Sequence, residues 1–299
     1  MTRTLVIGDA LIDEVRTNDG NSRFPGGAAL NLAVGLSILD LRAGLVTCVG
    51  DDMDGEWLRS YLEQNDVATF AAENPLGTGV AISDRTESEP RYEFNEAMVN
   101  RFVDVDSDVC TAASRSDLVA INSFPFDNAA QLSALDTLLD STSALIAVDP
   151  NPRPGLVRDI DAFRDGFEHI ARRSGVAKIS SEDAEMLYGK DIDQVGNHVI
   201  GLGARAVLLT AGRDGARVVT RKGDAVSCPI ANLPGPIVDT MGAGDAALAA
   251  LLKGIVHRGS SLDSQDWAKL LQFAMLVAAA TCREVGAQLQ VPDLSLEAR

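Results

Sequence analysis

The chain has 299 residues, of which 46% are hydrophobic and 23% charged, as is usual for a globular protein with one large domain or two ordinary ones. The net charge of −17 argues against a protein that binds the phosphate backbone of nucleic acids. The start lacks the long apolar stretch of a signal peptide, and the longest apolar runs, near 248–256 and 273–280, are too short to span a bilayer. We therefore expect a cytoplasmic protein without membrane or nucleic-acid partners.

Short apolar runs alternate with helical patterns along most of the chain. The runs expected to be strands are 4–8, 43–49, 117–121, 144–148, 176–179 and 206–210. Helices are expected at 26–39 and 54–64, and a helical stretch rich in Ala and Leu runs from about 242 to 284. This alternation predicts a mostly parallel α/β sheet that is covered on both faces.

Two segments interrupt the alternation. Residues 11–24 contain the turn sequence Asn-Asp-Gly-Asn, and residues 77–95 contain two strand-like runs around a polar turn at 86–90. Both look like hairpins inserted into the core. They could form a small antiparallel sheet that acts as a lid, here bounded as 11–24 and 77–97, or they could be plain surface loops. The chain shows no internal repeat and no linker, so one domain with a lid, 1–299, is expected.

The strongest local motif is the sequence DTMGAGD at 239–245, which runs directly into an apolar helix. Gly242 and Gly244 permit an unusual backbone path, and amides at a helix start have no partner within the helix. Such amides can hold phosphoryl oxygens, while the nearby Asp245 carboxylate can take a proton from a hydroxyl. A glycine-rich helix entry with an ordinary first-turn aspartate is the alternative.

Two further motifs suit ligand binding. GGAALN at 26–31 opens a helix with a glycine pair, and its Asn31 amide suits a sugar diol. Asp9 and Asp13 follow the first strand, at the edge where α/β sheets bind ligands. TAGRDG at 210–215 suits a loop beside a nucleotide, although each motif could also be a plain turn. A P-loop, the protein-kinase motifs and the dinucleotide fingerprint are all missing.

In this order and spacing, the three motifs resemble the ribokinase-like sugar kinases, or phosphofructokinase-B family, over nearly the whole chain. DTMGAGD is similar to the C-terminal signature of that family and GGAALN to its N-terminal one. The resemblance implies a doubly wound α/β fold with a small β-sheet lid. It also implies transfer of the ATP γ-phosphoryl group to a sugar hydroxyl, with magnesium and often potassium, and in many relatives a homodimer through the lid.

The resemblance also assigns roles to residues by motif match. Asp245 would be the general base, with Gly242, Ala243 and Gly244 as the anion hole. Asp13, Gly26, Gly27 and Asn31 would hold the sugar, and Asp9 and Ser123 are further candidates for substrate binding. Arg153 is a candidate for a phosphoryl or substrate contact, and the alternative is a solvated loop arginine. Those that would hold the nucleotide and its magnesium are Ser180, Asp183, Thr210, Gly212, Gly215 and Met275. Asp239 and the Met241 carbonyl would bind potassium.

Within the family, the stretch DPNPRP at 149–154 is similar to that of fructokinases, so fructose is the first expected substrate. Several positions depart from the family pattern. Ser180-x-x-Asp183 replaces an Asn-x-x-Glu, and Met275 stands where an adenine-contacting Asn is usual. Ala247 replaces a Phe, and Glu284 replaces a basic residue. These departures leave the exact substrate open.

Other functions remain as alternatives. A sugar-phosphate kinase should carry a basic cluster at the lid, but acids lie among the arginines there, which favours a neutral sugar. Kinases for ribose, 2-keto-3-deoxygluconate or a nucleoside stay open. A catalytically idle sugar-binding relative should have lost Asp245 or the glycines beside it, and both are present.

Overall fold

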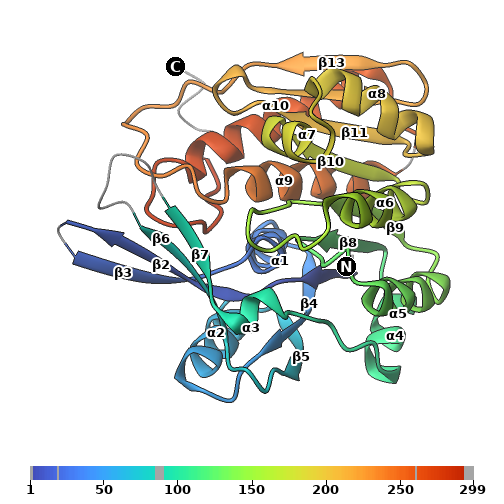
Figure 1. Ribbon diagram of the computed structural model, residues 1–299. Coiled ribbons are helices and arrows are strands. Elements are labelled where there is room, and N and C mark those ends of the chain that lie inside the picture. The colour runs from blue at the N-terminus through green and yellow to red at the C-terminus, as the bar shows by residue number, and fades with distance from the viewer. Residues whose placement is uncertain (1–2, 19, 85–90, 260, 293–299) are drawn as a thin grey trace.

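The computed structural model describes residues 3–18, 20–84, 91–259 and 261–292. Within them, nine strands form one large sheet in the order β13-β12-β11-β10-β9-β8-β1-β4-β5 (Figure 1). Their bounds are β1 Arg3–Gly8, β4 Arg42–Val49, β5 Ala68–Glu73, β8 Leu118–Asn122, β9 Leu145–Asp149, β10 Val176–Ser180, β11 Ala206–Thr210, β12 Ala216–Thr220 and β13 Ala225–Cys228. Every pair of neighbouring strands between β5 and β11 in this order is parallel. β12 pairs antiparallel with β11, and β13 pairs antiparallel with β12. The predicted mostly parallel sheet is confirmed.

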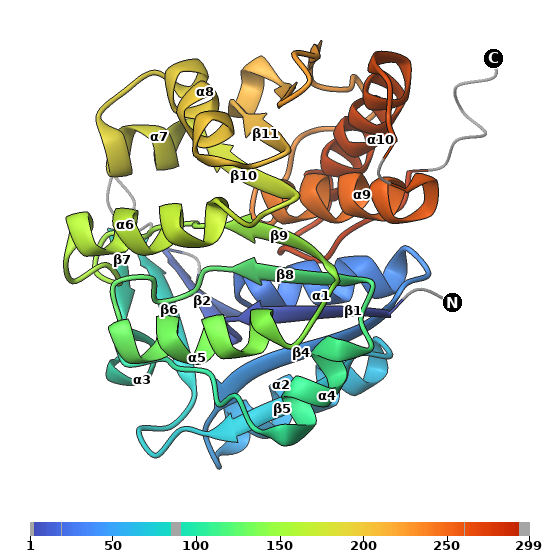
Figure 2. The ribbon, with the colours of Figure 1, turned by 90° about the vertical axis from the view of Figure 1, so that its right-hand side faces the viewer.

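Helices cover both faces of this sheet (Figure 2). Side chains of β1 alternate between two cores: Val6 packs with α1, α9 and α10, whereas Leu5 and Ile7 pack with α4, α5, α6 and α8. The helix bounds are α1 Ala28–Ile38, α2 Met53–Gln64, α3 Glu96–Val99, α4 Ser107–Ser114, α5 Ala129–Asp140, α6 Ile160–Ala171, α7 Ser181–Tyr188, α8 Ile192–Leu202, α9 Ala243–Arg258 and α10 Ser264–Thr281. The doubly wound arrangement follows from strands that are apolar on both faces.

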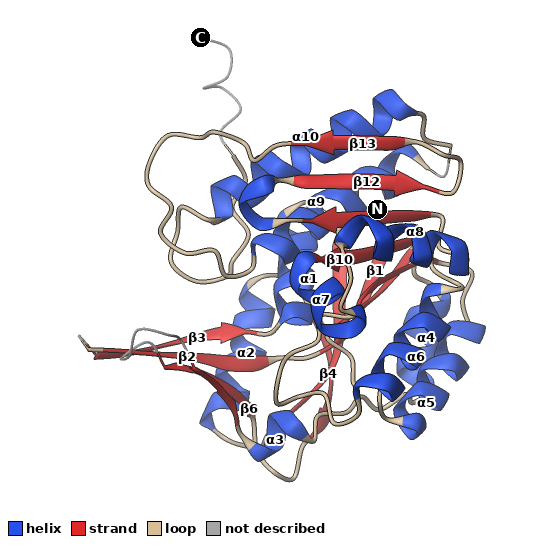
Figure 3. Ribbon diagram, turned by 45° about the horizontal axis from the view of Figure 1, so that its top comes forward, coloured by secondary structure: helices blue, strands red, loops and turns tan. Residues whose placement is uncertain are grey.

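A second, four-stranded sheet projects from the core (Figures 1 and 3). Its strands are β2 Leu11–Thr17, β3 Gly20–Gly26, β6 Gly79–Asp84 and β7 Arg91–Phe94. The two predicted hairpins, β2–β3 and β6–β7, are antiparallel, but β2 and β6 join them in parallel. The small sheet is therefore mixed at this seam, because both strands leave the core in the same direction. Residues 19 and 85–90, which include parts of both predicted turns, lie outside the described residues.

The predicted helical stretch at 242–284 proves to be two helices. Gly259, with φ 79°, ends α9, and Asp263 begins α10 with a capping box that Asp266 completes. The polar segment at 257–266, which separates the two apolar runs, marks this break in the sequence, and the prediction of one helical stretch passed over it. None of the helices in the described parts of the chain is long and apolar enough to cross a membrane.

Helix starts fall into two groups. Eight of the ten α-helices in the described residues begin with a side chain that accepts a hydrogen bond from a first-turn amide, namely Asp52, Asn95, Asp106, Asn128, Asp159, Ser180, Asp191 and Asp263. The other two, α1 and α9, begin with Gly27 and Gly242, which have no such group. These two helices carry the predicted glycine motifs.

An aromatic cluster fixes the loop after β8. The ring of Phe126 packs edge-on against Phe124, Phe163 and Phe167, at centroid distances of 5.3, 5.4 and 6.1 Å. All four rings are fully buried. Such pairs add to the free energy gained by burying each ring, so the cluster holds the backbone of Ser123 and its neighbours in place.

We expect Phe126→Ala to lower the free energy of unfolding by ~3–5 kcal/mol, because it leaves a cavity among three rings. Urea unfolding would measure this loss. Met53→Ala, at a side chain that is 85% exposed, is the control and should change stability by less than ~0.5 kcal/mol. A similar small loss for both variants would mean that the cluster does not support the fold.

Candidate active site

Polar residues gather at one edge of the large sheet. The strand registers pair Gly8 with Asn122, Asn122 with Asp149, and Ser180 with Thr210. All five residues end their strands, so the carboxyl ends of β1, β8, β9, β10 and β11 supply a row of polar groups. This is the edge at which open α/β sheets bind ligands.

The glycine pair before α1 makes room for two aspartates. A Cβ atom on Gly26 would lie 1.9 Å from Asp13 Oδ2, and one on Gly27, whose φ is 104°, would lie 3.0 Å from the Asp9 carbonyl oxygen. Asp9 Oδ1 accepts a hydrogen bond from the Ala29 amide at 2.9 Å. Asp9 therefore takes the place of the missing cap of α1, and Asp13 lies directly against the glycine backbone.

Asp245 joins the two glycine motifs. Its Oδ2 accepts a hydrogen bond from Asn31 Nδ2 at 3.2 Å, and its Oδ1 accepts one from Asn122 Nδ2 at 3.1 Å. Asn122 also donates to the Ala28 carbonyl at 3.2 Å. The front of α1 and the front of α9 thus meet in one site, although 214 positions separate Asn31 from Asp245.

The start of α9 leaves backbone amides open. Gly242 has φ 72°, and a Cβ atom there would lie 2.5 Å from the Ala287 carbonyl oxygen, so only glycine fits. The Ala243 amide donates to the Thr240 carbonyl at 3.3 Å. The amides of Gly242, Gly244 and Asp245 make no hydrogen bond with another described residue. In the predicted anion hole, the amides of Gly242 and Gly244 are therefore free to bind an anion, whereas the Ala243 amide already donates a hydrogen bond.

A buried cation lies under this helix start. Lys178 on β10 is 5% exposed, and its Nζ lies 2.8 Å from Asp149 Oδ2 and 4.0 Å from Asp183 Oδ2. Burial lowers the pKa of Lys178, but Asp149 and Asp183 outweigh burial and raise it, so the amine stays charged. A Cβ atom on Gly244 would lie 3.6 Å from Lys178 Nζ. The absence of a side chain at Gly244 thus opens the amine toward the amides.

The same surroundings set the proton affinity of Asp245. Burial and the nearby Asp149 charge raise its pKa, whereas Lys178 and the amides of Asn31 and Asn122 lower it, and the result is a pKa of about 7. A carboxylate with this pKa is a much better proton acceptor near neutral pH than an ordinary aspartate.

Sequence reasoning missed three residues of this site. Asn122 and Lys178 were not predicted, and Asp149 was noted only as part of the DPNPRP stretch. The available signal was a polar residue in or at the end of a mostly apolar strand, Asn122 in LVAIN at 118–122 and Lys178 in VAKIS at 176–180. A buried polar group in such a strand requires a partner. Asn122 donates to Asp245 and to the Ala28 carbonyl, and Lys178 pairs with Asp149.

Ser180 and Asp183 form a capping box at the start of α7. The Asp183 amide donates to Ser180 Oγ at 3.0 Å, and the Ser180 amide donates to Asp183 Oδ2 at 2.7 Å. Asp183 Oδ1 and Asp149 Oδ1 are buried and have no hydrogen-bond partner among the described residues. Two free carboxylate oxygens fit magnesium, which usually takes one or two carboxylates together with phosphate oxygens and water.

Three of the remaining predicted nucleotide residues, Thr210, Gly212 and Gly215, lie at and after the end of β11, whereas Met275 lies on α10. Gly212 has φ 50° and open space around its Cα, as expected for a contact loop. Gly215 must be a glycine for packing as well, because a Cβ atom there would lie 2.3 Å from the Cys228 carbonyl oxygen. Thr210 ends β11, and Met275 on α10 is 6% exposed within the core.

The remaining sugar and potassium candidates have different surroundings. Ser123 is buried with φ 52°, and its amide donates to the Asp149 carbonyl at 3.2 Å. Arg153 is exposed, and its charge is close enough to lower the pKa of Asp9, Asp13 and Asp149. Asp239 accepts hydrogen bonds from the Met241 and Gly286 amides at 3.0 and 3.3 Å, which brace the loop before α9.

The cysteines and histidines take no part in this site. The four cysteines are free thiols. His169 and His198 form exposed pairs with Asp136 and Glu168. Across the described segments, no group of three or more His, Cys, Asp or Glu side chains is arranged to hold a metal ion.

Comparison with known proteins assigns the chain to a family. The family model described as pfkB family carbohydrate kinase matches residues 1–294. The chain belongs to this family. It is accordingly an ATP-dependent carbohydrate kinase, as the resemblance in its motifs implied.

Named relatives and solved structures are similar over most of the chain. An ATP-dependent 6-phosphofructokinase of Thermoanaerobacterium thermosaccharolyticum is 25% identical, covering 97% of this chain and 91% of its own. A fructokinase of Rhizobium leguminosarum bv. trifolii is 28% identical, covering 84% and 79%. The structure of an uncharacterised sugar kinase of Pyrococcus horikoshii matches with a TM-score of 0.79 at 26% identity, covering 100% and 97%. The expected ribokinase-like fold is confirmed.

The crowding of carboxylates predicts how stability depends on pH. Burial, followed by the charges of Asp9, Asp245 and Asp239, raises the pKa of Asp13 from 3.8 to about 7. Between these two values the folded protein holds a proton that the unfolded chain has lost. The free energy of unfolding therefore falls as the pH rises through this window.

We expect Asp13→Asn to remove the loss of stability that ionisation of Asp13 causes at high pH. At about pH 8.5 the free energy of unfolding of the variant should exceed that of the parent by ~1–3 kcal/mol. This difference should become smaller as the pH falls toward about 5.5. Urea unfolding at both pH values would measure it, with the exposed Asp51→Asn as control. A parent that is the more stable at the higher pH would contradict the raised pKa.

Proposed function

We propose that this kinase phosphorylates a neutral sugar, with fructose as the first candidate and Asp245 as the general base. The observation that carries the proposal is the position of the Asp245 carboxylate. It lies between the two asparagines at the sugar end and the open amides at the start of α9. A hydroxyl bound there would have a proton acceptor on one side and an anion-binding group on the other.

In the proposed reaction, the sugar is bound by Asp13, Asn31 and the backbone at Gly26 and Gly27. Carboxylate and amide groups suit hydroxyl groups because together they both accept and donate hydrogen bonds. Asp245 takes the proton of the hydroxyl as the hydroxyl oxygen attacks the γ-phosphorus of ATP. The bond between that phosphorus and the bridging β,γ-oxygen breaks, and ADP leaves. A positioned base of this kind contributes about 10²–10⁴-fold to the rate.

The phosphoryl oxygens would be stabilised by the amides of Gly242 and Gly244 and by the charge of Lys178. Amides fixed at a helix start need no reorganisation as charge shifts, which makes them effective in the transition state. We add Lys178 to the predicted anion hole because its amine lies beneath Gly244. Ala243 contributes mainly through its backbone path, since its amide already donates to Thr240.

Ions and nucleotide are assigned in the same way. Magnesium would be held by the free oxygens of Asp183 and Asp149, where it would offset phosphate charge. Ser180 acts by fixing Asp183 through the capping box. The nucleotide would lie along Thr210, Gly212 and Gly215, with Met275 on the adenine side. Potassium would be bound by the Met241 carbonyl and Asp239, whose carboxylate keeps a free lone pair on each oxygen.

Charge at the sugar end supports a neutral acceptor. Arg23 on β3 is bound by Asp54 through both carboxylate oxygens, at 2.9 and 2.7 Å, and lies 3.4 Å from Glu14. Arg16 lies 2.7 Å from the same Glu14. These arginines are thus already neutralised, and Asp9 and Asp13 would repel a sugar phosphate. Arg153 is the candidate for a substrate contact on this side.

The small sheet is proposed to act as the lid of this single domain. Its β2 strand carries Asp13, so a movement of the sheet would move a sugar ligand with it. Closure would exclude water, which otherwise competes for the phosphoryl group. Pairing of two lids in a homodimer stays a prediction from the resemblance.

The role of Asp245 is tested by Asp245→Asn with ATP, magnesium, potassium and a sugar panel. We expect turnover to fall by ~10²–10⁴-fold while the fold and nucleotide binding persist. In the parent, activity should decline as the pH falls through about 7, because Asp245 becomes protonated. Asp108→Asn, in the first turn of α4, is the matched control and should leave activity unchanged.

The acceptor panel separates the alternatives. Fructose, ribose, 2-keto-3-deoxygluconate, adenosine and fructose 6-phosphate should be compared by ADP release. Highest activity with fructose supports the proposal, and highest activity with fructose 6-phosphate would refute a neutral acceptor. Silence with every acceptor would favour a catalytically idle sugar-binding relative.

A further inference from the structure

Arg101 is a buried cation that the proposed reaction does not use. It follows α3, at the base of the small sheet, and is only 8% exposed. Its Nε donates a hydrogen bond to the Ser123 carbonyl at 3.3 Å. Its two terminal nitrogens have no hydrogen bond with the described residues. Burial lowers its pKa, and the charge of Asp9 opposes this, but an arginine still keeps its charge.

A second arginine lies next to it. Arg158, from the loop before α6, donates to the Val99 carbonyl at 3.2 Å and to Asn100 Oδ1 at 2.6 Å. Its charge is close enough to lower the pKa of Arg101. Neither guanidinium has a carboxylate oxygen within 4.0 Å among the residues placed by the structure. Two adjacent unpaired cations are unusual in a chain with a net charge of −17.

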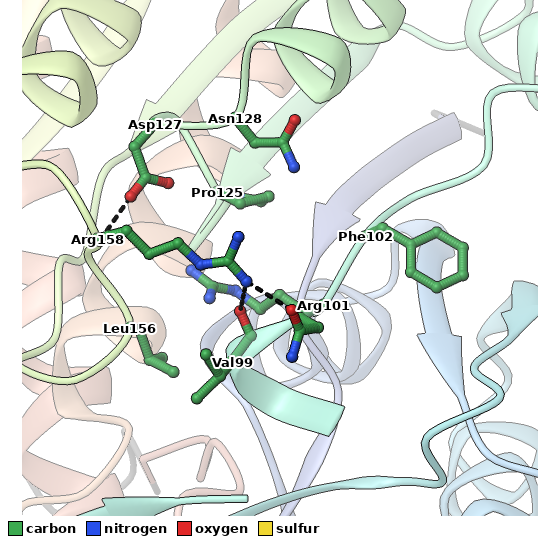
Figure 4. Close-up of a pocket in the computed structure, with 9 residues that line it drawn as sticks. Val99, Arg101, Phe102, Pro125, Asp127, Asn128, Leu156 and Arg158 are labelled. Atoms are coloured by element: carbon green, nitrogen blue, oxygen red, sulfur yellow. Dashed lines mark hydrogen bonds between the residues drawn. The ribbon is translucent and has the colours of Figure 1, made fainter. Parts of the chain in front are cut away.

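The two arginines line a small cavity of about 90 Å³ (Figure 4). Phe102, Pro125 and Leu156 supply apolar walls. Asn128 also lines it; its Oδ1 caps α5 by accepting from the Ala130 and Gln131 amides, which leaves its Nδ2 as a further donor. Apolar walls weaken the screening of charge, so an anion in this space would be attracted more strongly than one in open water.

One lining residue opposes an anion. The carboxylate of Asp127 faces the same region, and its charge acts on Arg101. Its Oδ2 accepts hydrogen bonds from the amides of Arg158 and Asp159, at 2.7 and 3.3 Å. Asp127 thus braces the loop that presents Arg158, and the lining retains a net positive charge from two arginines against one aspartate.

We propose that this cavity is a binding site for a small oxyanion, either free phosphate or the phosphate group of a small metabolite. Guanidinium groups hold tetrahedral oxyanions through paired hydrogen bonds, and two of them here have unused donors. The site is separate from the proposed anion hole at α9, because it lies between α3, the start of α5 and the loop before α6. Arg101 links it to the sugar end through Ser123.

The proposal can be tested by calorimetric titration of the complete protein with inorganic phosphate and, separately, with glycerol 3-phosphate. Arg158→Gln should weaken binding by ~10-fold or more, since it removes charge-assisted hydrogen bonds from an exposed, replaceable side chain. Asp127→Asn should tighten binding several-fold, because it removes the negative charge that opposes the anion. The loop should keep its structure, since the oxygen of the asparagine amide can still accept the two backbone hydrogen bonds. The exposed Arg115→Gln is the matched control and should bind like the parent.

The two substitutions are expected to change the affinity for phosphate in opposite directions. A folding defect could weaken binding but could not tighten it, so the test does not depend on whether a variant folds less well. If inorganic phosphate binds and glycerol 3-phosphate does not, the cavity is a site for the free anion. If glycerol 3-phosphate binds more tightly than inorganic phosphate, the cavity is a site for a phosphorylated metabolite. The absence of binding at millimolar phosphate overturns the proposal. Binding that is unchanged in both Arg158→Gln and Asp127→Asn also overturns it, because the anion would then occupy another place such as the start of α9.

Discussion

The arrangement of buried charge around Lys178 is the constraint on which the rest of the site depends. Asp149 and Asp183 contact or approach its amine, and Asp245 lies near enough for the same charge to lower its pKa. Without a cation, this many carboxylates could not stay ionised together in a buried place. With one cation, the balance leaves Asp245 with a pKa of about 7, which is suited to accepting a proton near neutral pH.

The fold supplies this arrangement through parallel strands and two uncapped helices. Parallel strands end at one edge, so Asn122, Asp149 and Ser180 lie along the same edge although each ends a different strand. Eight helices satisfy their first amides with their own caps. The start of α1 borrows Asp9, and that of α9 stays open. The open helix is the one that carries the proposed base.

Sequence patterns predicted what is local and periodic. Six strands of the large sheet, the two hairpins and the glycine motifs are each encoded within a few residues and were predicted, whereas β5, β12 and β13 were not. The meeting of the two glycine motifs at Asp245 was implied by the resemblance to the family. Lys178 and Asn122 could not be predicted, because one polar residue in an apolar strand reveals no partner until the sheet order is known. The parallel seam between β2 and β6 was missed for a similar reason, because it depends on how distant segments pack. The break between α9 and α10 is encoded locally, by Gly259 and by the Asp263 cap, and was overlooked.

The raised pKa of Asp245 is tested most directly by following its carboxyl carbon by NMR during a pH titration of the complete protein. The resonance is assigned by its absence from the spectrum of Asp245→Asn. The account predicts a midpoint near 7, set by burial and Asp149 against Lys178. A midpoint near the ordinary aspartate value of about 4 would contradict it. In that case Asp245 would be a weak base, and the charge arrangement around Lys178 would not tune it.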